Sequence, residues 1–439
     1  MPHIAPWFPD AKYGIFIHWV LKSIWMADGD RSAGYATDPA DPNHPHRLAE
    51  RFTAERFDAR AWGRLFKSWG AGYAVLTTKH HIGFSLFDCP AGDFSAARHS
   101  PAGRDLVAEF CEGMRDAGLK VGLYYSLPDW SHPDYASLAG GSDPKKFSQQ
   151  DEPHRWERFL QCMFAEVQHL CTAYGGIDLL WFDGDWERTA EQWRSIELAE
   201  MIQRLQPGIV LNNRLRHECL GHYGTPESTP PLGPRRGDGW WEFCTTPGDN
   251  WDGPGANEHL KPPSELVRLV ADMVGMGGNV LLNVAPAPDG TIPEPQIEVM
   301  NPLGRWVDVH REALHHSRPG LPAGLFNGAS TRRGSVLYLI AFDQPREELV
   351  VKGLKTMPET VTHLASGQPL PWRSSGGRPK FNQPGWILIK VPHRFMDDYA
   401  TVIRLTFPDD TLRVQCPDGA ELTWKGRPPL EEKAVSEAR

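Results

Sequence analysis

The sequence of 439 residues lacks a long apolar run and any cluster of basic residues. A helix that crosses a membrane needs about 20 consecutive apolar residues, so we expect no membrane association. Proteins that bind nucleic acid need cationic surfaces to neutralise phosphates, and the net charge here is −9. We therefore expect no nucleic-acid partner and favour a neutral ligand.

Cysteines are few, odd in number and never spaced as CxxC. The seven cysteines are scattered along the chain, which indicates neither a disulfide framework nor a zinc site. The chain begins Met1-Pro2-His3 and shows no basic segment followed by the apolar segment of a signal peptide. We expect a cytoplasmic protein, although a signal peptide that had been removed would leave a similar start.

Residues 1–316 alternate between apolar runs and amphipathic helical stretches. The apolar runs are 13–19, 73–78, 119–125, 177–182, 209–212 and 279–284, each typical of a strand buried on both faces. Helical spacing occupies 62–69, 105–114 and 156–167, and a further helix begins at Pro263. This order predicts a (β/α)8-like barrel. Two of the eight strands are hard to place in the loop-rich region between residues 213 and 262, so the barrel could be irregular.

The pattern changes after residue 316. Separate β-runs with turn signals occupy 335–342, 349–354, 386–391 and 402–407, and no helical pattern interrupts them. Residues 317–426 are therefore predicted to form a C-terminal antiparallel β-sandwich. Residues 427–439 have no apolar pattern and are expected to be a frayed tail.

Polar residues terminate five of the predicted barrel strands. In a barrel of this type the active site lies at the carboxyl ends of the strands. The residues at these ends are His18 and Trp19, Lys79-His80-His81, Tyr125-Ser126, Asp183-Gly184-Asp185, and Asn213-Arg214. Their convergence at one rim predicts the position of the site.

Asp183 is the first candidate for catalysis, because an acid that directly follows a buried strand lies at the mouth of the barrel. Glycoside hydrolysis needs two carboxyl groups, one beside the anomeric carbon and one beside the leaving oxygen. Strand alternation would place Trp181 and Asp183 on one face, a pairing typical of sugar sites. Asp185 and Glu187 compete with Asp183, and an ordinary exposed loop carboxylate is the plainer alternative.

Two glutamates compete for the role of proton donor. Glu227 lies in Gly224-Thr225-Pro226-Glu227, a loop that a lid movement could carry into place. Glu242 lies among aromatic residues, whose surroundings would raise the pKa of a carboxyl. Spacing alone does not separate them.

Aromatic rings and imidazoles supply candidate sugar contacts. Seventeen tryptophans are a high number, and those near strand ends or loops, such as Trp19, Trp181 and Trp251, could stack on the apolar face of a sugar instead of filling a core. Adjacent side chains on a strand diverge, so His80 and His81 are not expected to bind a metal. They could instead bind sugar hydroxyls or be ordinary buried histidines.

Five segments, in this order, resemble glycoside hydrolase family 29, the α-L-fucosidases. They are Lys12-Tyr13-Gly14-Ile15-Phe16-Ile17-His18-Trp19, Thr78-Lys79-His80-His81, Gly122-Leu123-Tyr124-Tyr125-Ser126-Leu127-Pro128-Asp129-Trp130, Leu180-Trp181-Phe182-Asp183-Gly184 and Gly277-Gly278-Asn279-Val280-Leu281-Leu282-Asn283-Val284. The resemblance runs through most of residues 7–320. It implies an exo-acting retaining double displacement on terminal α-L-fucosides of a fucosylated oligosaccharide or glycoside, without a metal or organic cofactor; the oligomeric state is not predicted.

The resemblance also implies roles for individual residues. Asp183 matches the family nucleophile, and the segment 221–227 matches a subgroup in which a Thr-Pro-Glu loop supplies the acid/base, here Glu227. Glu242 remains the alternative. The residues expected to contact the sugar are His18, Trp19, His80, His81, Tyr125, Trp181, Arg214, Glu242 and Trp251.

The chain departs from the family pattern at three positions. Ile82 stands where the family has aspartate, and Val20 where it has glycine. Ala33-Gly34-Tyr35 stands where the family has Glu-Trp-Tyr, so a carboxylate that contacts sugar hydroxyls is missing. This departure leaves open a glycosidase of the same fold that acts on a related sugar. An inactive carbohydrate-binding protein is a separate alternative, against which Asp183 and the two candidate acids argue.

Overall fold

The computed structural model describes residues 4–30, 33–135, 152–217, 220–233, 239–253, 259–343, 348–378, 381 and 383–426. The predicted tail at 427–439 lies outside these residues. The chain divides into two compact units, Met1–Pro263 with Gly278–Asp308 and Ser264–Gly277 with Val309–Arg439. The predicted boundary after residue 316 stays a prediction.

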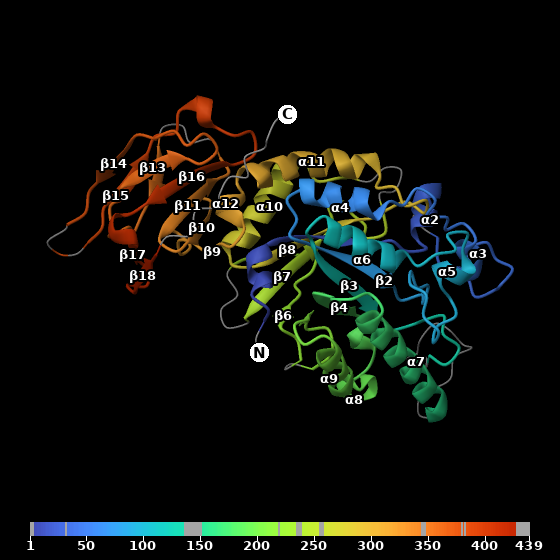
Figure 1. The fold of residues 1–439 in the computed structure, drawn as a ribbon. Coiled ribbons are helices and arrows are strands. Elements are labelled where there is room, and N and C mark those ends of the chain that lie inside the picture. The colour runs from blue at the N-terminus through green and yellow to red at the C-terminus, as the bar shows by residue number, and fades with distance from the viewer. Residues whose placement is uncertain are drawn as a thin grey trace. The chain divides into compact units, whose positions relative to one another are not determined.

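Eight parallel strands form the sheet of the first unit (Figure 1). They are β1 (Tyr13–Ile17), β2 (Tyr73–Lys79), β3 (Lys120–Ser126), β4 (Leu179–Asp183), β5 (Val210–Leu211), β6 (Tyr223–Gly224), β7 (Trp240–Thr245) and β8 (Asn279–Val284). Their order is β5-β4-β3-β2-β1-β8-β7-β6, and a parallel bridge between Asn212 and Tyr223 joins the two ends. The predicted barrel is confirmed. The two strands that the sequence did not reveal are β6 and β7, and β6 is only two residues long.

Alternation along the strands fills the barrel with side chains. One buried apolar cluster takes residues from all eight strands, with large rings from five of them. These rings belong to Phe16, Tyr73, Tyr124, Trp181 and Tyr223. Because side chains alternate between the two faces of a strand, the next inward position along β1 is His18 and the next along β4 is Asp183. The packed rings therefore form a floor beneath the polar residues at the strand ends.

Helices precede, connect and follow these strands. They are α1 (Trp7–Ala11), α2 (Ser23–Asp28), α3 (Pro45–Ala49), α4 (Ala59–Ser68), α5 (Ala96–His99), α6 (Leu106–Asp116), α7 (Pro153–Thr172), α8 (Ala190–Trp193), α9 (Ser195–Leu205) and α11 (Glu294–Val309), with a 3-10 turn at Asp185–Glu187. Asp58 and Asp105 cap α4 and α6, each accepting a backbone N–H at 2.9 Å. These two helices pack closely because a Cβ on Gly63 would come within 2.5 Å of the Gly113 carbonyl oxygen. No helix in the described ranges is both long and apolar enough to span a bilayer.

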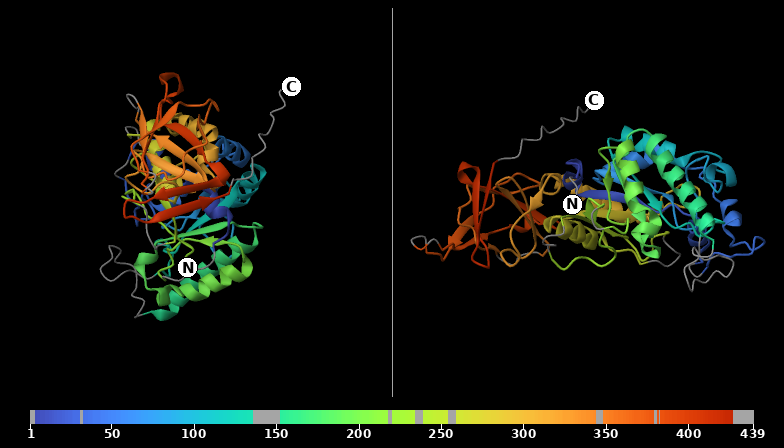
Figure 2. Two further views of the ribbon diagram at one scale, coloured as in Figure 1. Left: turned by 90° about the vertical axis from the view of Figure 1, so that its left-hand side faces the viewer. Right: turned by 90° about the horizontal axis from the view of Figure 1, so that it is seen from below.

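The second unit contains α10 (Pro263–Gly275), drawn in yellow in Figure 2, together with α12 (Arg311–Leu314) and antiparallel sheets, drawn in orange and red. Its strands are β9 (Arg318–Pro319), β10 (Ala329–Arg333), β11 (Val336–Ala341), β12 (Leu349–Val351), β13 (Thr360–His363), β14 (Trp372–Ser375), β15 (Trp386–Ile389), β16 (Thr401–Thr406), β17 (Thr411–Gln415) and β18 (Glu421–Lys425), with 3-10 turns at His393–Phe395 and Pro408–Asp410. The sheet β13-β16-β11-β10-β9 and the sheet β12-β15-β14 bury one shared core, as the predicted β-sandwich requires.

A buried charged cluster supports the segment that carries His80 and His81. The Lys79 ammonium lies 2.5 Å from Glu166 of α7 and 3.3 Å from Asp129, and all three side chains are nearly inaccessible to solvent. The Tyr125 hydroxyl donates a hydrogen bond of 2.5 Å to the same Glu166 carboxylate. Opposite charges and hydrogen bonds compensate one another here, which a buried ion requires.

Replacing Lys79 with methionine should destabilise the first unit strongly, because Glu166 and Asp129 would lose the cation that compensates their burial. The expected cost is roughly 3 to 5 kcal/mol, seen as a lower melting temperature in calorimetry. The double variant Lys79→Met/Glu166→Gln should recover part of this loss. Purely additive effects of the two substitutions would contradict the pairing.

Candidate active site

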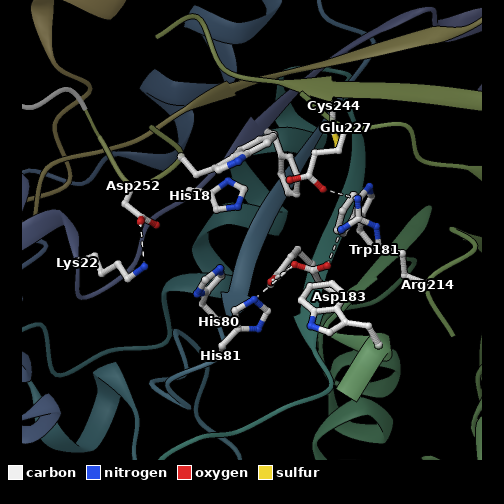
Figure 3. A pocket seen from close by; sticks show the side chains of 14 residues that line it. His18, Lys22, His80, His81, Trp181, Asp183, Arg214, Glu227, Cys244 and Asp252 are labelled. Atoms are coloured by element: carbon white, nitrogen blue, oxygen red, sulfur yellow. Dashed lines mark hydrogen bonds and ion pairs between the residues drawn. The ribbon is translucent and has the colours of Figure 1, made fainter. Parts of the chain in front are cut away.

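A pocket of about 300 Å³ opens at the carboxyl ends of the barrel strands (Figure 3). Its lining comes from β1, β3, β4 and β7 and from the loops that follow the strands. The lining residues are Phe16, His18, Lys22, His80, His81, Tyr124, Trp181, Asp183, Trp186, Arg214, Glu227, Cys244, Trp251 and Asp252. Rings and charged groups therefore face the same space, as a sugar with apolar faces and polar edges requires.

Asp183 is the last residue of β4, and hydrogen bonds fix its carboxylate. The Tyr124 hydroxyl donates to one carboxylate oxygen at 3.0 Å, and Arg214 donates to the other at 2.6 Å. The next residue, Gly184, has φ 78°, and a Cβ there would come within 2.2 Å of Pro128. The chain thus turns away directly after Asp183 and leaves its carboxylate at the pocket surface.

Arg214 connects the two candidate catalytic carboxylates. Its second terminal nitrogen lies 2.5 Å from Glu227, and its Nε donates to the Thr225 hydroxyl at 3.0 Å. Burial lowers the pKa of the guanidinium, but the charges of Asp183 and Glu227 outweigh this and raise its pKa above the ordinary value. Both carboxylates therefore lie close together across one permanent positive charge.

Three histidines line the pocket in neutral form. Burial lowers the pKa of His18 and His81 and lowers that of His80 well below its usual value. His18 Nδ1 lies 2.6 Å from the Asn283 side-chain oxygen, and His81 Nδ1 lies 2.6 Å from the Ser126 hydroxyl. The fixed neutral ring of His18 keeps its other nitrogen available to a sugar hydroxyl. His81 also lies 3.6 Å from Asp183 through Nε2.

Glu242 lies inside the barrel, below the pocket. It is fully buried and accepts hydrogen bonds from the Trp181 indole at 3.1 Å and from the Tyr73 hydroxyl. Burial raises the pKa of its carboxyl to about 7. Trp181 lies between Glu242 and the pocket, and its ring lies 4.4 Å from the Arg214 guanidinium.

Three of the predicted sugar-contacting residues do not reach the pocket. Trp19 points outward from the strand end and packs among Phe52, Phe57 and Trp62. Tyr125 faces the buried Glu166, because its neighbour Tyr124 takes the inward position on β3. Glu242 is separated from the pocket by Trp181.

The competing acids Asp185 and Glu187 also lie outside the pocket lining. Asp185 accepts the backbone N–H of Arg216 at 3.1 Å, and Glu187 accepts the Trp130 indole N–H at 2.9 Å. Both carboxylates hold neighbouring loops together. Of the acids in this segment, Asp183 alone lines the pocket.

The expected residues His18, His80, His81, Trp181, Asp183, Arg214, Glu227 and Trp251 all line the pocket. Sequence reasoning missed Tyr124, Lys22 and Asp252 as site residues. Tyr124 could have been found, because it pairs with Trp181 across β3 and β4 and therefore faces the same side of the sheet. No spacing rule could place Lys22 and Asp252, because both come from loops.

Among the residues that the structure describes, no three His, Cys, Asp or Glu side chains form a group that could hold a metal ion. The pocket instead combines two carboxylates, an arginine, neutral histidines and aromatic rings at the mouth of a parallel barrel. Paired carboxyl groups in a sugar-shaped pocket are the apparatus of glycoside hydrolysis. Fold and site together define a glycoside hydrolase.

Comparison with known proteins narrows this class. The α-L-fucosidase family model matches residues 2–312, so the chain belongs to the α-L-fucosidase family. Human tissue α-L-fucosidase is 28% identical over 413 residues, which cover 86% of this chain and 84% of that protein.

Solved structures give the same result. α-L-Fucosidase isoenzyme 1 from Paenibacillus thiaminolyticus has a TM-score of 0.80 and 30% identity, covering 92% of this chain and 98% of that one. A family 29 α-L-fucosidase from Bacteroides thetaiotaomicron, trapped as a covalent intermediate with 2-fluoro-fucosyl fluoride in a glutamate-to-glutamine mutant, has a TM-score of 0.77 and 26% identity. It covers 91% of this chain and 94% of that one.

The buried Glu242 predicts how stability depends on pH. Its pKa is about 7 in the folded chain against 4.5 for an unperturbed glutamate, so between these values the folded state holds more protons than the unfolded state. The contribution of Glu242 to stability is therefore full below pH 4.5 and is lost as pH rises towards 7. Glu242→Gln keeps the neutral form and should gain on the order of 3 kcal/mol relative to the parent over this window.

Melting temperatures of the parent and of Glu242→Gln, measured from pH 4.5 to 8, check this expectation. The difference between the two proteins should shift in favour of the variant as pH rises and become constant above pH 7. A difference independent of pH would mean that Glu242 is ionised throughout.

Proposed function

We propose that this protein is a retaining exo-α-L-fucosidase in which Asp183 is the nucleophile and Glu227 is the acid/base. The observation that carries the proposal is the contact of one guanidinium, that of Arg214, with both carboxylates at the pocket surface. Retaining enzymes need their two carboxyl groups about 5 to 5.5 Å apart, and a shared guanidinium keeps two carboxylates close together.

The first step forms a covalent intermediate. An Asp183 oxygen attacks the anomeric carbon while the bond to the leaving oxygen breaks, and Glu227 gives its proton to that oxygen. The product is a glycosyl ester on Asp183 and an ionised Glu227. Tyr124 and Arg214 hold the attacking carboxylate in one orientation through its two oxygens.

The second step reverses the proton transfer. Glu227 removes a proton from water as the water oxygen attacks the anomeric carbon, and the ester bond to Asp183 breaks. The two inversions together retain the anomeric configuration. The Glu227 side chain is 37% exposed, which suits a group that has to meet a leaving alcohol and then a water molecule.

Glu227 has to change partners during this cycle. A carboxylate paired with Arg214 cannot donate a proton, so the first step requires that Glu227 leave the guanidinium and take up a proton. A substrate that fills the pocket would exclude water from Glu227, and the loss of water favours the neutral, protonated form of a carboxyl group. We infer that the arriving sugar occupies the space beside Arg214 and leaves Glu227 to face the glycosidic oxygen.

Glu242 does not suit the acid/base role, even though its raised pKa favours proton donation. The carboxylate accepts hydrogen bonds from Trp181 and Tyr73 below the pocket and has no path to a glycosidic oxygen. Geometry precedes pKa in the choice of a catalytic acid. The substrate in this proposal is a terminal α-L-fucoside of an oligosaccharide or glycoside. The cytoplasmic location expected from the sequence stays a prediction.

Asp183→Ala should reduce hydrolysis of 4-nitrophenyl α-L-fucoside by at least about a thousandfold, because the covalent step loses its nucleophile. Steady-state kinetics measure this loss, and an unchanged melting temperature shows that the fold is kept. Asp185→Ala is the matched control, since Asp185 lies outside the pocket. Comparable losses in both variants would contradict the assignment.

Glu227→Ala should lower turnover of an aryl fucoside, and added azide should restore it. Azide needs no base and can attack the glycosyl ester, so the product becomes fucosyl azide of retained configuration. Glu242→Ala should show no such rescue, because a small anion cannot replace a side chain beneath Trp181. Rescue of the Glu242 variant with none for the Glu227 variant would exchange the two roles.

A further inference from the structure

A second charged pair lines the pocket and has no part in the mechanism above. The Lys22 ammonium lies 3.4 Å from the Asp252 carboxylate, and both residues come from loops that follow strand ends. The Asp252 side chain is 17% exposed, and that of Lys22 is 36% exposed. The pair is thus partly shielded from water and faces the cavity.

The pair lies across the pocket from the catalytic carboxylates. In Figure 3, Asp183, Arg214 and Glu227 gather on one side, Lys22 and Asp252 lie on the other, and His18 and His80 stand between them. A sugar whose anomeric carbon rests against Asp183 extends its ring across this space. The groups that reach Lys22 and Asp252 are then those on the ring carbons farthest from the anomeric centre.

The chemistry of the pair matches a vicinal diol. An ionised carboxylate offers two acceptor oxygens, and an ammonium offers donors beside them, so adjacent hydroxyls can donate to the first and accept from the second. Hydrogen bonds to charged groups are stronger than those between neutral groups. Trp251, next to Asp252 in the chain, also lines the pocket, and its ring lies 5.0 Å from that of His18.

We propose that Lys22 and Asp252 determine glycone specificity by binding the hydroxyls at C3 and C4 of the terminal sugar. The proposal rests on the proposed function, because the orientation of the sugar follows from attack by Asp183. In L-fucose these two hydroxyls are cis and adjacent, so one carboxylate can reach both. An epimer at either carbon would leave one charged group without its partner, which costs more than losing a contact.

Asp252 also borders a second cavity of about 500 Å³. Its lining is largely apolar and comes from α2 and from the loop after β8, with Met26, Ala287 and Pro293 among its residues. Asp252 therefore belongs to the lining of both cavities, whereas Lys22 lines the catalytic pocket. Because the second cavity lies next to Asp252, this side of the sugar pocket offers a charged carboxylate and its hydrogen bonds beside open space.

A cycle of enzyme and substrate changes tests the pair. Asp252→Asn should lower kcat/KM for 4-nitrophenyl α-L-fucoside by about 10- to 100-fold, the loss expected for a hydrogen bond to a charged group. The parent should have a lower kcat/KM on the 3-deoxy and 4-deoxy analogues of this fucoside than on the fucoside itself. On at least one of these analogues, kcat/KM of Asp252→Asn should lie within about threefold of the parent's value. Lys22→Met should show the same pattern with smaller losses.

Asp28→Asn is the matched control. Asp28 borders the second cavity and binds Arg51, but does not line the catalytic pocket, so this variant should keep the parent's kcat/KM. Equal losses for Asp252→Asn on the fucoside and on both deoxy substrates would overturn the proposal, as would no loss at all. Melting temperatures of every variant separate these outcomes from unfolding.

Binding of free L-fucose, measured by calorimetry, separates this proposal from the proposed function. The parent should bind L-fucose more tightly than Asp252→Asn does, whether or not it hydrolyses the glycoside. Fucose binding that depends on Asp252, without any turnover of fucosides, would overturn the proposed function alone. Turnover of fucosides with equal fucose binding by parent and variant would overturn the role of the pair alone.

Discussion

The site depends on the contact of one arginine with two acids. Arg214 donates to Asp183 at 2.6 Å and lies 2.5 Å from Glu227, and its planar guanidinium rests 4.4 Å from the Trp181 ring. Two carboxylates would repel each other in a pocket lined by aromatic rings if no cation stood between them. Because the guanidinium stays charged at every physiological pH, it holds both acids in a fixed geometry before any substrate arrives.

The barrel places this contact through layers of alternating side chains. Glu242 supports Trp181 from below, Trp181 supports Arg214, and Arg214 orients the acids at the rim. Trp181 and Asp183 lie two apart on β4, and Tyr124, which donates to Asp183, pairs with Trp181 across β3 and β4, so the register of these strands determines this part of the geometry. Glu242, buried inside the barrel, thereby helps to position Arg214 through Trp181 without touching a substrate.

Strand periodicity made the barrel predictable, and it fails where strands are short. β8 occupies the predicted run, whereas β6 has only two residues, too few to show any period. The position of Asp183 followed from the end of a buried strand. Glu227 could not be distinguished from Glu242 by pattern, since one lies in a loop and the other inside the barrel, and hydrophobic neighbours alone favoured the buried residue. Lys22 and Asp252 could not be predicted, because loop geometry brings them together.

Trapping the intermediate tests the central claim most directly. The protein would be incubated with a 2-fluoro-fucosyl fluoride, digested, and its peptides sequenced by mass spectrometry. The account predicts release of the anomeric fluoride and one 2-fluoro-fucosyl adduct, on the peptide that contains Asp183, formed at the rate at which activity is lost. An adduct on Glu227 or Asp185, or complete inactivation without an adduct on Asp183, would contradict it.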